Sequence, residues 1–140
     1  MADGEFLQSL KCDLSEIGKT IVKLEAFSEE NALPNGPFQQ VVLVLDELLT
    51  NVISYGFPDV RTADISVSAN LKDGALHVMI EDNGVAFDPL REAAIPDIDA
   101  NMEDRNIGGL GVHIAKTMMD DISYLRVDNK NQLRFHKNLG

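Results

Sequence analysis

Two runs of alternating apolar and polar residues constrain the fold of this chain most. They span residues 63–72 and 75–82, and only the pair Asp73-Gly74 separates them. An Asp-Gly pair favours the tight turn of a β-hairpin, because both positions of such a turn need positive φ. The chain therefore contains an antiparallel pair of strands, and the other elements must be arranged around it.

Apolar spacing predicts three helices and three more strands around this hairpin. Asp13 and Glu16 have the spacing of a capping box, which marks the start of a helix. Pro37 suits the first turn of a second helix, because no N–H is needed there. The predicted strands cover about 5–13, 122–127 and 132–137, and the predicted helices about 13–31, 37–54 and 109–119. This order predicts an α+β domain with one antiparallel or mixed sheet and helices on one face.

Residues 83–109 break this regular pattern. The segment is polar, contains Pro89 and Pro96, and has room for at most a short helix at about 90–94. Long irregular segments inside compact domains are usually functional lids or disordered chain. Both possibilities stay open at this point.

Length and charge restrict the function. The 140 residues fit a single domain, residues 1–140, that is large enough to bury a core. There are 12 Lys and Arg against 23 Asp and Glu, a formal net charge of -11, and the basic residues are spread along the chain. We therefore expect no nucleic acid and no membrane surface as a partner, since both are anionic. The longest apolar run, Val41–Leu45, cannot span a bilayer, and Met1–Glu5 lacks positive charge, so we expect a soluble, cytoplasmic protein.

The first candidate site is the pair Glu47 and Asn51, four residues apart in a predicted helix. This spacing places both side chains on one helix face, one turn apart. A carboxylate there can accept a proton or orient water, and the Asn oxygen can bind a hard cation such as Mg²⁺. The alternative is a solvated helix face. Asn51 lies among apolar residues such as Leu48 and Val52, however, where an amide is unfavourable unless a ligand or water satisfies it.

The second candidate site follows the hairpin, at Asp82-Asn83-Gly84 and Phe87-Asp88-Pro89. An aspartate at a strand end can accept a hydrogen bond from an exocyclic amino group, and a nearby glycine lets a flat ring approach the backbone. The alternative is a plain turn, because Asn-Gly is a common hairpin signal. No alternating strand follows, which weakens that alternative. Phe87, considered by itself, is predicted to be a core residue.

The third candidate site is Gly108-Gly109-Leu110-Gly111, immediately before a predicted helix. Backbone N–H groups at a helix N-terminus bind phosphate, and glycines permit close approach. The segment matches neither the P-loop nor the dinucleotide fingerprint, and a flexible hinge or helix entry explains it equally well. Arg105, just upstream, can pair with a terminal phosphate or lie in a surface ion pair.

Other chemistries lack the residues that they need. His77, His113 and His136 are scattered, without Cys or His neighbours at metal-ligand spacing, so we expect no zinc site. No Ser stands in a nucleophile-elbow motif G-x-S-x-G. The single Cys12 cannot form an internal disulfide, and its apolar-alternating surroundings favour a buried thiol over a reactive one.

The order and spacing of the three candidate sites resemble the N, G1 and G2 boxes of the GHKL ATPases, the superfamily of gyrase, histidine-kinase and mismatch-repair ATP-binding domains. Within it, the chain resembles the stand-alone anti-sigma-factor serine/threonine-protein kinases of bacterial partner-switching systems. The resemblance covers nearly the whole chain. It is carried by Glu47 to Asn51, Asp82-x-Gly84 with Phe87-Asp88-Pro89, Gly108 to Gly111 with Met119-Asp120, and the closing Asn131-x-Leu133-x-Phe135-x-Lys137.

The resemblance implies a Bergerat ATP-binding fold, a two-layer α/β sandwich that binds Mg-ATP between its helices and a mobile ATP lid at about residues 85–107. Glu47 would then be the general base, Asn51 the Mg²⁺ ligand, and Asp82 the acceptor for the adenine amino group. Gly84 would make room for the ring. The other residues implied in nucleotide binding are Phe87, Arg105, Gly108, Gly109, Leu110 and Gly111.

The chain departs from the family pattern at two places. The family often carries His or Lys where Ser54-Tyr55 stands, which predicts an altered cation environment. It often carries Gly-x-Thr before the last strand, where this chain has Asn129-Lys130-Asn131, which predicts that a phosphate contact is missing.

The implied substrate is a serine or threonine of a STAS-domain antagonist protein, and the implied second partner is a sigma factor. The same resemblance is compatible with a homodimer. One alternative is a non-catalytic, nucleotide-gated module that sequesters a partner without phosphorylating it. Another is the catalytic fragment of a histidine kinase, which is disfavoured because the N-terminal residues already form the first strand and helix and leave no dimerisation hairpin.

Overall fold

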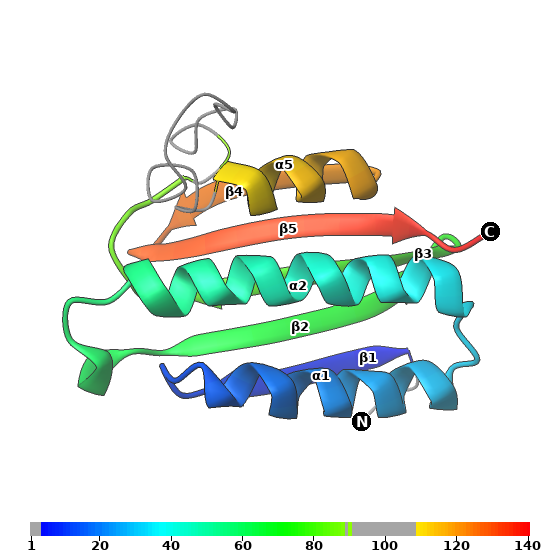
Figure 1. The fold of residues 1–140 in the computed structure, drawn as a ribbon, viewed down its shortest axis with the longest axis horizontal. Helices are drawn as coiled ribbons and strands as arrows, with labels where there is room; N and C mark the ends of the chain where they lie inside the picture. The colour runs from blue at the N-terminus through cyan, green and yellow to red at the C-terminus, as the bar shows by residue number, and fades with distance from the viewer. Residues whose placement is uncertain (1–3, 89, 91–108) are drawn as a thin grey trace.

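A five-stranded antiparallel sheet with the strand order β1-β2-β3-β5-β4 is the framework of the computed structural model, which describes residues 4–88, 90 and 109–140 (Figure 1). Every pair of neighbouring strands is antiparallel, which decides between the antiparallel and mixed sheets that the sequence left open. The elements are β1 (Glu5–Leu10), α1 (Ser15–Glu30), α2 (Asn35–Tyr55), η1 (Val60–Thr62), β2 (Ile65–Lys72), β3 (Ala75–Asp82), α5 (Gly109–Met118), β4 (Asp121–Val127) and β5 (Lys130–Asn138).

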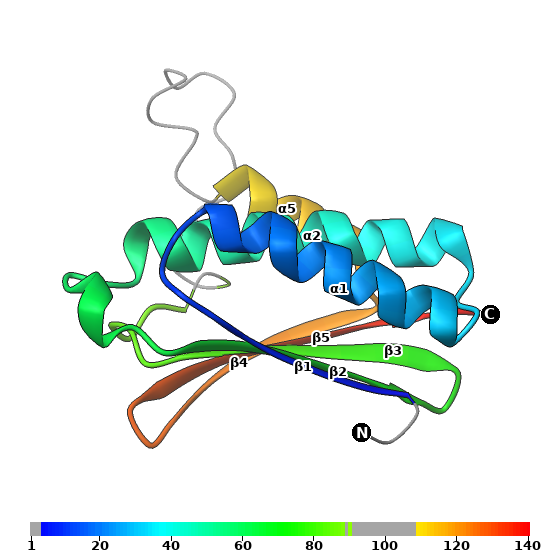
Figure 2. The same cartoon turned by 90° about the horizontal axis from the view of Figure 1, so that it is seen from below.

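The helices form a second layer on one face of the sheet. Figure 2 shows α1, α2 and α5 side by side above the strands, while the opposite face of the sheet points away from all three. The structure therefore confirms the predicted α+β two-layer arrangement with helices on one face. Within the part of the chain that the structure describes, no helix is both long and apolar enough to cross a membrane.

Two tight turns set the register of the sheet. The predicted Asp73-Gly74 turn is confirmed, since both residues have positive φ, 54° and 76°, and β2 pairs with β3 directly on either side. Asp128 and Asn129 also have positive φ, 52° and 64°, and they join β4 to β5. Because of this second turn β5 begins at Lys130, two residues earlier than the apolar pattern indicates.

The start of α1 differs from the predicted capping box. The Asp13 carboxylate accepts from the backbone N–H of Ser15 at 2.9 Å, and the Glu16 carboxylate accepts from the N–H of Lys11 at 3.1 Å. A capping box would join the Asp13 side chain to the N–H of Glu16, and the Glu16 side chain to the N–H of Asp13. The capping-box prediction is therefore wrong, because both N–H groups that it needs already donate to backbone carbonyls, that of Asp13 to Lys11 at 2.9 Å and that of Glu16 to Asp13 at 3.0 Å.

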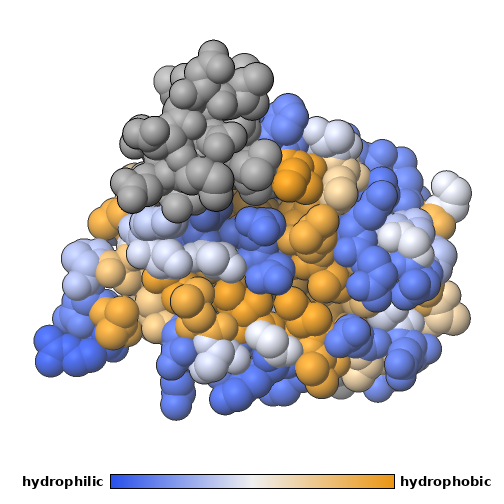
Figure 3. All heavy atoms as spheres, viewed as in Figure 1, coloured by the Kyte–Doolittle hydropathy of each residue, from blue (hydrophilic) through white to orange (hydrophobic). Residues whose placement is uncertain are grey.

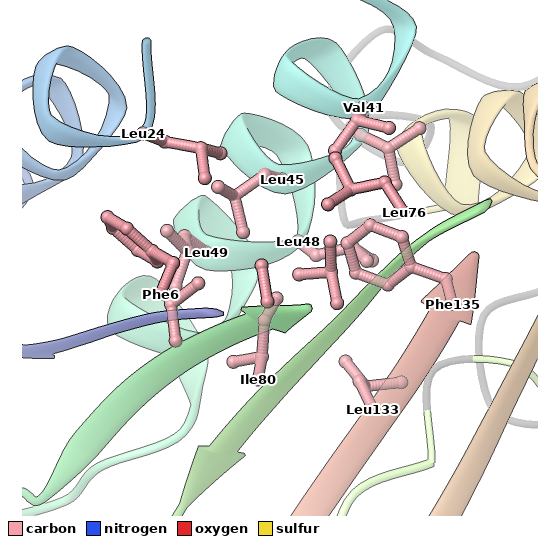
Figure 4. Close-up of a cluster of buried hydrophobic side chains, with 14 of the residues drawn as sticks. Phe6, Leu24, Val41, Leu45, Leu48, Leu49, Leu76, Ile80, Leu133 and Phe135 are labelled. Atoms are coloured by element: carbon pink, nitrogen blue, oxygen red, sulfur yellow. The ribbon is translucent and has the colours of Figure 1, made fainter. Parts of the chain in front are cut away.

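The core lies between the inner face of the sheet and the helices. Figure 4 shows side chains from β1, β3, β5, α1 and α2 pointing toward one another in this space. Helix α2 contributes most, through Val41, Val44, Leu45, Leu48 and Leu49, all essentially inaccessible to solvent. Their 3- and 4-residue spacing keeps one stripe of the helix against the sheet. On the outer side of the helices, Figure 3 shows further apolar side chains among hydrophilic ones.

We predict that Leu45→Ala destabilises the fold by about 2 to 5 kcal/mol, since it removes a fully buried side chain and leaves a cavity. Leu43→Ala is the matched control on the same helix, because Leu43 is 39% exposed. Its cost should stay within about 1 kcal/mol. Urea denaturation followed by circular dichroism measures both, and equal losses would contradict the assignment of the core face of α2.

Candidate nucleotide-binding site

A cleft opens where the C-terminal half of α2 meets the ends of β3 and β5. Its walls are mainly apolar, and the polar side chains in its lining are those of Asn51, Tyr55, Asp82 and Asn131. Small-molecule sites typically combine an apolar lining with a few placed polar groups. The residues that line the cleft are Leu48, Asn51, Val52, Tyr55, Gly56, Asp82, Val85, Phe87, Asn131 and Leu133.

Asp82 is the buried carboxylate of this cleft and is only 4% exposed. Its Oδ1 accepts both from the backbone N–H of Gly84, at 2.9 Å, and from Nδ2 of Asn131, at 3.0 Å. Burial raises the pKa of Asp82, and the two hydrogen bonds oppose that rise. Both bonds use the same oxygen. Among the described residues Oδ2 has no hydrogen-bond partner, so it is available to a donor on a ligand.

Asn131 holds this carboxylate in place. It lies directly opposite Asp82 in the β3–β5 register and is 5% exposed. Its Nδ2 donates to Asp82 and to the carbonyl of Val85 at 2.8 Å, while its Oδ1 accepts from the Tyr124 hydroxyl and from the N–H of Phe87 at 3.5 Å. The amide thus makes the four hydrogen bonds that an Asn side chain can make.

Sequence reasoning missed the role of Asn131. The sequence associates Asn131 with the closing motif of the family resemblance and with the loss of a phosphate contact, whereas the structure places it against Asp82. A signal was available, because Asn131 alternates with Leu133 and Phe135 and so takes an inward position of the strand. A polar residue at an inward position needs a buried partner.

Gly84 is required by a close approach of two backbone segments. A Cβ at this position would lie 2.4 Å from the carbonyl oxygen of Gly56, at the end of α2. The neighbouring Val85 donates its N–H to that same oxygen at 2.9 Å. From the sequence, this glycine is predicted to let a flat ring approach the backbone. The backbone contact with Gly56 already requires it, and Arg126 on β4 fixes the segment further by donating to the Gly84 carbonyl at 2.9 Å.

Phe87 is 42% exposed and forms part of the cleft wall. The prediction that it is a core residue is therefore wrong. The chain turns away from the sheet after β3, so the ring is left at the edge of the cleft.

Glu47 and Asn51 lie one turn apart on α2, as predicted, and both are half-buried. Asn51 lines the cleft and Glu47 lies one turn before it. Neither side chain has a hydrogen-bond or ion-pair partner among the described residues. Those residues also contain no group of three or more His, Cys, Asp or Glu that could hold a metal ion by itself. Mg²⁺ usually keeps several waters and needs only one or two protein oxygens beside substrate phosphates, so a single Asn oxygen fits such an ion.

Helix α5 begins at Gly109, which confirms the predicted helix start in the glycine-rich segment. Gly109, Leu110 and Gly111 form its first turn. Gly108, Arg105 and the predicted lid and short helix beyond residue 90 lie outside the described residues. At the edge of that segment, Lys116 of α5 donates to the carbonyl of Leu90 at 3.1 Å.

Cys12 is half-buried, and its Sγ donates to the carbonyl of Ile53 at 3.6 Å. Burial raises the pKa of the thiol, and the neighbouring Asp13 raises it further. The reactive thiolate is therefore disfavoured, although the thiol is half-buried and not buried as predicted.

Residues 10–137 match the family described as the histidine kinase-like ATPase domain. The chain belongs to this family. Among curated proteins, this histidine kinase-like ATPase domain is 31% identical over 93 residues to the serine/threonine-protein kinase BtrW of Bordetella bronchiseptica, across 66% of this chain and 65% of that protein. It is 29% identical over 87 residues to the serine-protein kinase RsbW of Listeria monocytogenes, across 60% of this chain and 55% of that protein. The matched region is thus less than two thirds of either relative.

Solved structures share the fold of the domain at low sequence identity. The crystal structure of the RsbU and RsbW domains of a Mycobacterium tuberculosis protein superposes with a TM-score of 0.70 at 14% identity, over 96% of this chain and 32% of that one. The blue-light-activated histidine kinase of Erythrobacter litoralis gives 0.56 at 18% identity, over 76% and 32%. Both likenesses support the ATPase-domain fold.

We predict that Asp82→Asn stabilises the fold at neutral pH by about 0.5 to 2 kcal/mol. Asn keeps the oxygen that accepts from Gly84 and Asn131, and it cannot ionise. Burial raises the folded-state pKa of Asp82 above its unfolded value, so wild-type stability is lost as the pH rises through the folded-state pKa. The advantage of the variant should vanish below about pH 3.9, where the carboxyl is protonated in both states.

Urea denaturation of both proteins between pH 3 and pH 8 measures this difference. Asp82→Ala is the control, because it removes the acceptor and leaves the Gly84 N–H and the Asn131 amide unpaired. It should be less stable than Asp82→Asn by about 1 to 3 kcal/mol at every pH, since neither variant can ionise at this position. An Asp82→Asn protein that is less stable than wild type at pH 7 would contradict the argument.

Proposed function

We propose that the domain binds Mg-ATP in the cleft beside Asp82 and acts as a protein serine/threonine kinase. The single observation that carries the proposal is the buried Asp82, which Asn131 and Gly84 orient through one oxygen, while no residue that the structure describes bonds to the other. Membership of the histidine kinase-like ATPase family and the similarity to two proteins named serine kinases support it.

The cleft selects adenine through Asp82. An exocyclic amino group donates to the Oδ2 atom, and a guanine ring would place a carbonyl oxygen against the carboxylate at the same position, so ATP is preferred to GTP. Leu48, Val52 and Leu133 supply the apolar surface against which the ring lies, and Phe87 lies at its edge.

The phosphates extend toward the N-terminus of α5, where free backbone N–H groups of the first turn stabilise negative charge. Arg105 and Gly108, just before this turn in sequence, belong to the same proposed phosphate site. The Asn51 side-chain oxygen, which lines the cleft from α2, would hold Mg²⁺. Mg-ATP supplies the γ-phosphoryl group and the neutralisation of its charge.

Glu47 is the proposed general base. It lies one helical turn from Asn51 and has no ion-pair partner among the described residues. It accepts the proton of the substrate hydroxyl as that oxygen bonds to the γ-phosphorus and the bond from phosphorus to the ADP oxygen breaks. The products are a phosphorylated serine or threonine and ADP.

The protein substrate that we propose is a STAS-domain antagonist, and the second partner is a sigma factor, as in partner-switching systems. The proposal thus makes the protein a cytoplasmic anti-sigma regulatory factor that is able to form a homodimer. The resemblance to the anti-sigma-factor kinases supports these assignments.

Nucleotide binding has a direct test in thermal unfolding with ATP, ADP and GTP, with and without Mg²⁺. A ligand that binds only the folded state stabilises it by about 2.7 kcal/mol at one hundred times its Kd. We expect ATP and ADP to raise the Tm, GTP to have little effect, and Asp82→Asn to lose the response while remaining folded. If no adenine nucleotide raises the Tm at millimolar concentration, the cleft is not a nucleotide site.

Catalysis is tested by transfer of radiolabelled phosphate from ATP to a STAS-domain protein encoded nearby. Glu47→Ala should lower the rate by about 10² to 10⁴. The variant should keep the ATP-induced rise in Tm, because Glu47 does not line the cleft. Equal transfer by the variant and the wild type would exclude Glu47 as the base. ATP-dependent capture of the partner that survives Glu47→Ala and a nonhydrolysable analogue, without phosphoprotein, would establish the nucleotide-gated module instead.

A further inference from the structure

The sheet face opposite the helices carries a shallow trough of about 490 Å³ that the nucleotide cleft does not include. Its position follows from strand alternation. Leu76 and Val78 of β3 and Phe135 of β5 are buried under the helices, so His77 and His136 between them point to the open face. Figure 2 shows that α1, α2 and α5 all lie on the other side of the sheet.

Two histidines occupy the centre of the trough. His77 and His136 are directly opposite each other in the β3–β5 register, and their rings stack with centroids 5.0 Å apart at 29°. Both are half-buried. A charged imidazole beside another is unfavourable unless an anion accompanies them. The pair therefore gains most from a ligand that carries negative charge.

Permanent cations surround the pair. Lys72 of β2 and Arg134 of β5 line the same trough, and neither has an ion-pair partner in the described part of the chain. The Arg134 guanidinium donates only to Gln132 there, at 2.8 Å. In a chain of net charge -11, this local excess of positive charge stands out.

Two carboxylates face the same row of residues. Asp121 of β4 is opposite His136 and lines the trough, and Glu5 of β1 lies beyond Asn70 at the other end of the row. No ion pair joins either carboxylate to the histidines in the described structure. With both histidines protonated the lining residues carry two imidazolium ions, one Lys and one Arg against one Asp, which is a net charge of +3.

Hydrogen-bond donors dominate the lining. Besides the four basic side chains, the hydroxyls of Ser68 and Ser123 and the amide of Asn70 border the trough. So many donors suit a group with at least three acceptor oxygens and about two negative charges, which describes a phosphate ester better than a carboxylate. A water molecule takes about 30 Å³, and a phosphate group takes only a small multiple of that volume. One phosphate would therefore leave most of the 490 Å³ trough empty. The phosphate must therefore belong to a larger ligand, and a shallow open trough across a sheet fits an extended chain.

We propose that this trough, formed around His77, His136, Lys72 and Arg134, binds a phosphorylated segment of a partner protein. The site is separate from the nucleotide cleft, because it lies on the opposite face of the sheet. The failure of either proposal leaves the other unaffected.

The test is an NMR titration of the imidazole Cε1–H signals with a ten-residue glycine- and alanine-rich peptide that contains one phosphoserine. The three histidines of the chain supply an internal control, since His113 is exposed on α5 and far from the open face in the fold. We expect the signals of His77 and His136 to shift as the phosphopeptide is added. The His113 signal should not move, and excess ADP should not displace the peptide.

Variants locate the site. Arg134→Gln and Lys72→Gln should each weaken phosphopeptide binding by about tenfold, because each loses a charged donor. Lys19→Gln removes an exposed cation from α1 instead and should leave binding unchanged. All three positions are exposed, so the fold is retained.

Four results would overturn the proposal. The first is that the unphosphorylated peptide shifts the His77 and His136 signals equally, and the second is that the His113 signal moves as much as theirs. The third is that millimolar phosphopeptide shifts neither His77 nor His136. The fourth is that both Arg134→Gln and Lys72→Gln keep the wild-type affinity for the phosphopeptide. Inorganic phosphate that binds as tightly as the phosphopeptide would show that the occupant is a free oxyanion, and the assignment to a protein segment would be wrong.

Discussion

The pairing of Asp82 with Asn131 is the interaction on which the candidate site depends. It joins the last residue of β3 to an inward residue of β5, and the same amide holds the segment from Val85 to Phe87 and the Tyr124 hydroxyl. A buried carboxylate is unfavourable without such partners. Within the described part of the chain these partners satisfy only Oδ1 of Asp82, so Oδ2 remains as an acceptor.

Helix α2 connects this polar centre to the hydrophobic core. One stripe of the helix, including Leu45 and Leu49, is fully buried against the sheet, while Asn51 and Val52 of the following turn line the cleft. The apolar residues fix the rotation of the helix about its axis. That rotation decides which polar side chains face the cleft, so core packing positions Asn51 as well as stabilising the fold.

The two faces of the sheet differ in chemistry because strand alternation separates them. Inward residues such as Ile80 and Leu133 meet the helices, and the outward residues between them form a polar surface with its own concentration of basic groups. A net charge of -11 describes the chain as a whole and conceals this local distribution. Anionic ligands are thus compatible with an acidic protein when backbone amides, a metal ion or a few clustered cations bind them.

The sequence by itself determined the elements and most of their order. The alternation of apolar and polar residues predicted the strands, and apolar residues at 3.6-residue spacing predicted the helices. Asp73-Gly74 predicted the turn between β2 and β3. All three signals are local properties of the chain. The spacing of Glu47, Asn51 and Asp82 with the glycine-rich segment also indicated the family. Tertiary structure decided what depends on residues distant in sequence. Asn131 meets Asp82 across 49 positions, and Gly84 meets Gly56 across two elements.

The predictions from sequence that were wrong failed because they depended on contacts that local patterns do not determine. Asp13 and Glu16 have the spacing of a capping box, but backbone carbonyls already accept from both N–H groups that the box needs. Phe87 has the large apolar side chain typical of a core, but it stands where the chain leaves the sheet and is 42% exposed. The stacking of His77 on His136 could not be predicted from their separation in sequence, since only strand register brings them together. Local pattern therefore determined which elements form, and strand register and helix packing decided which side chains meet, because such contacts depend on where the whole chain places each element.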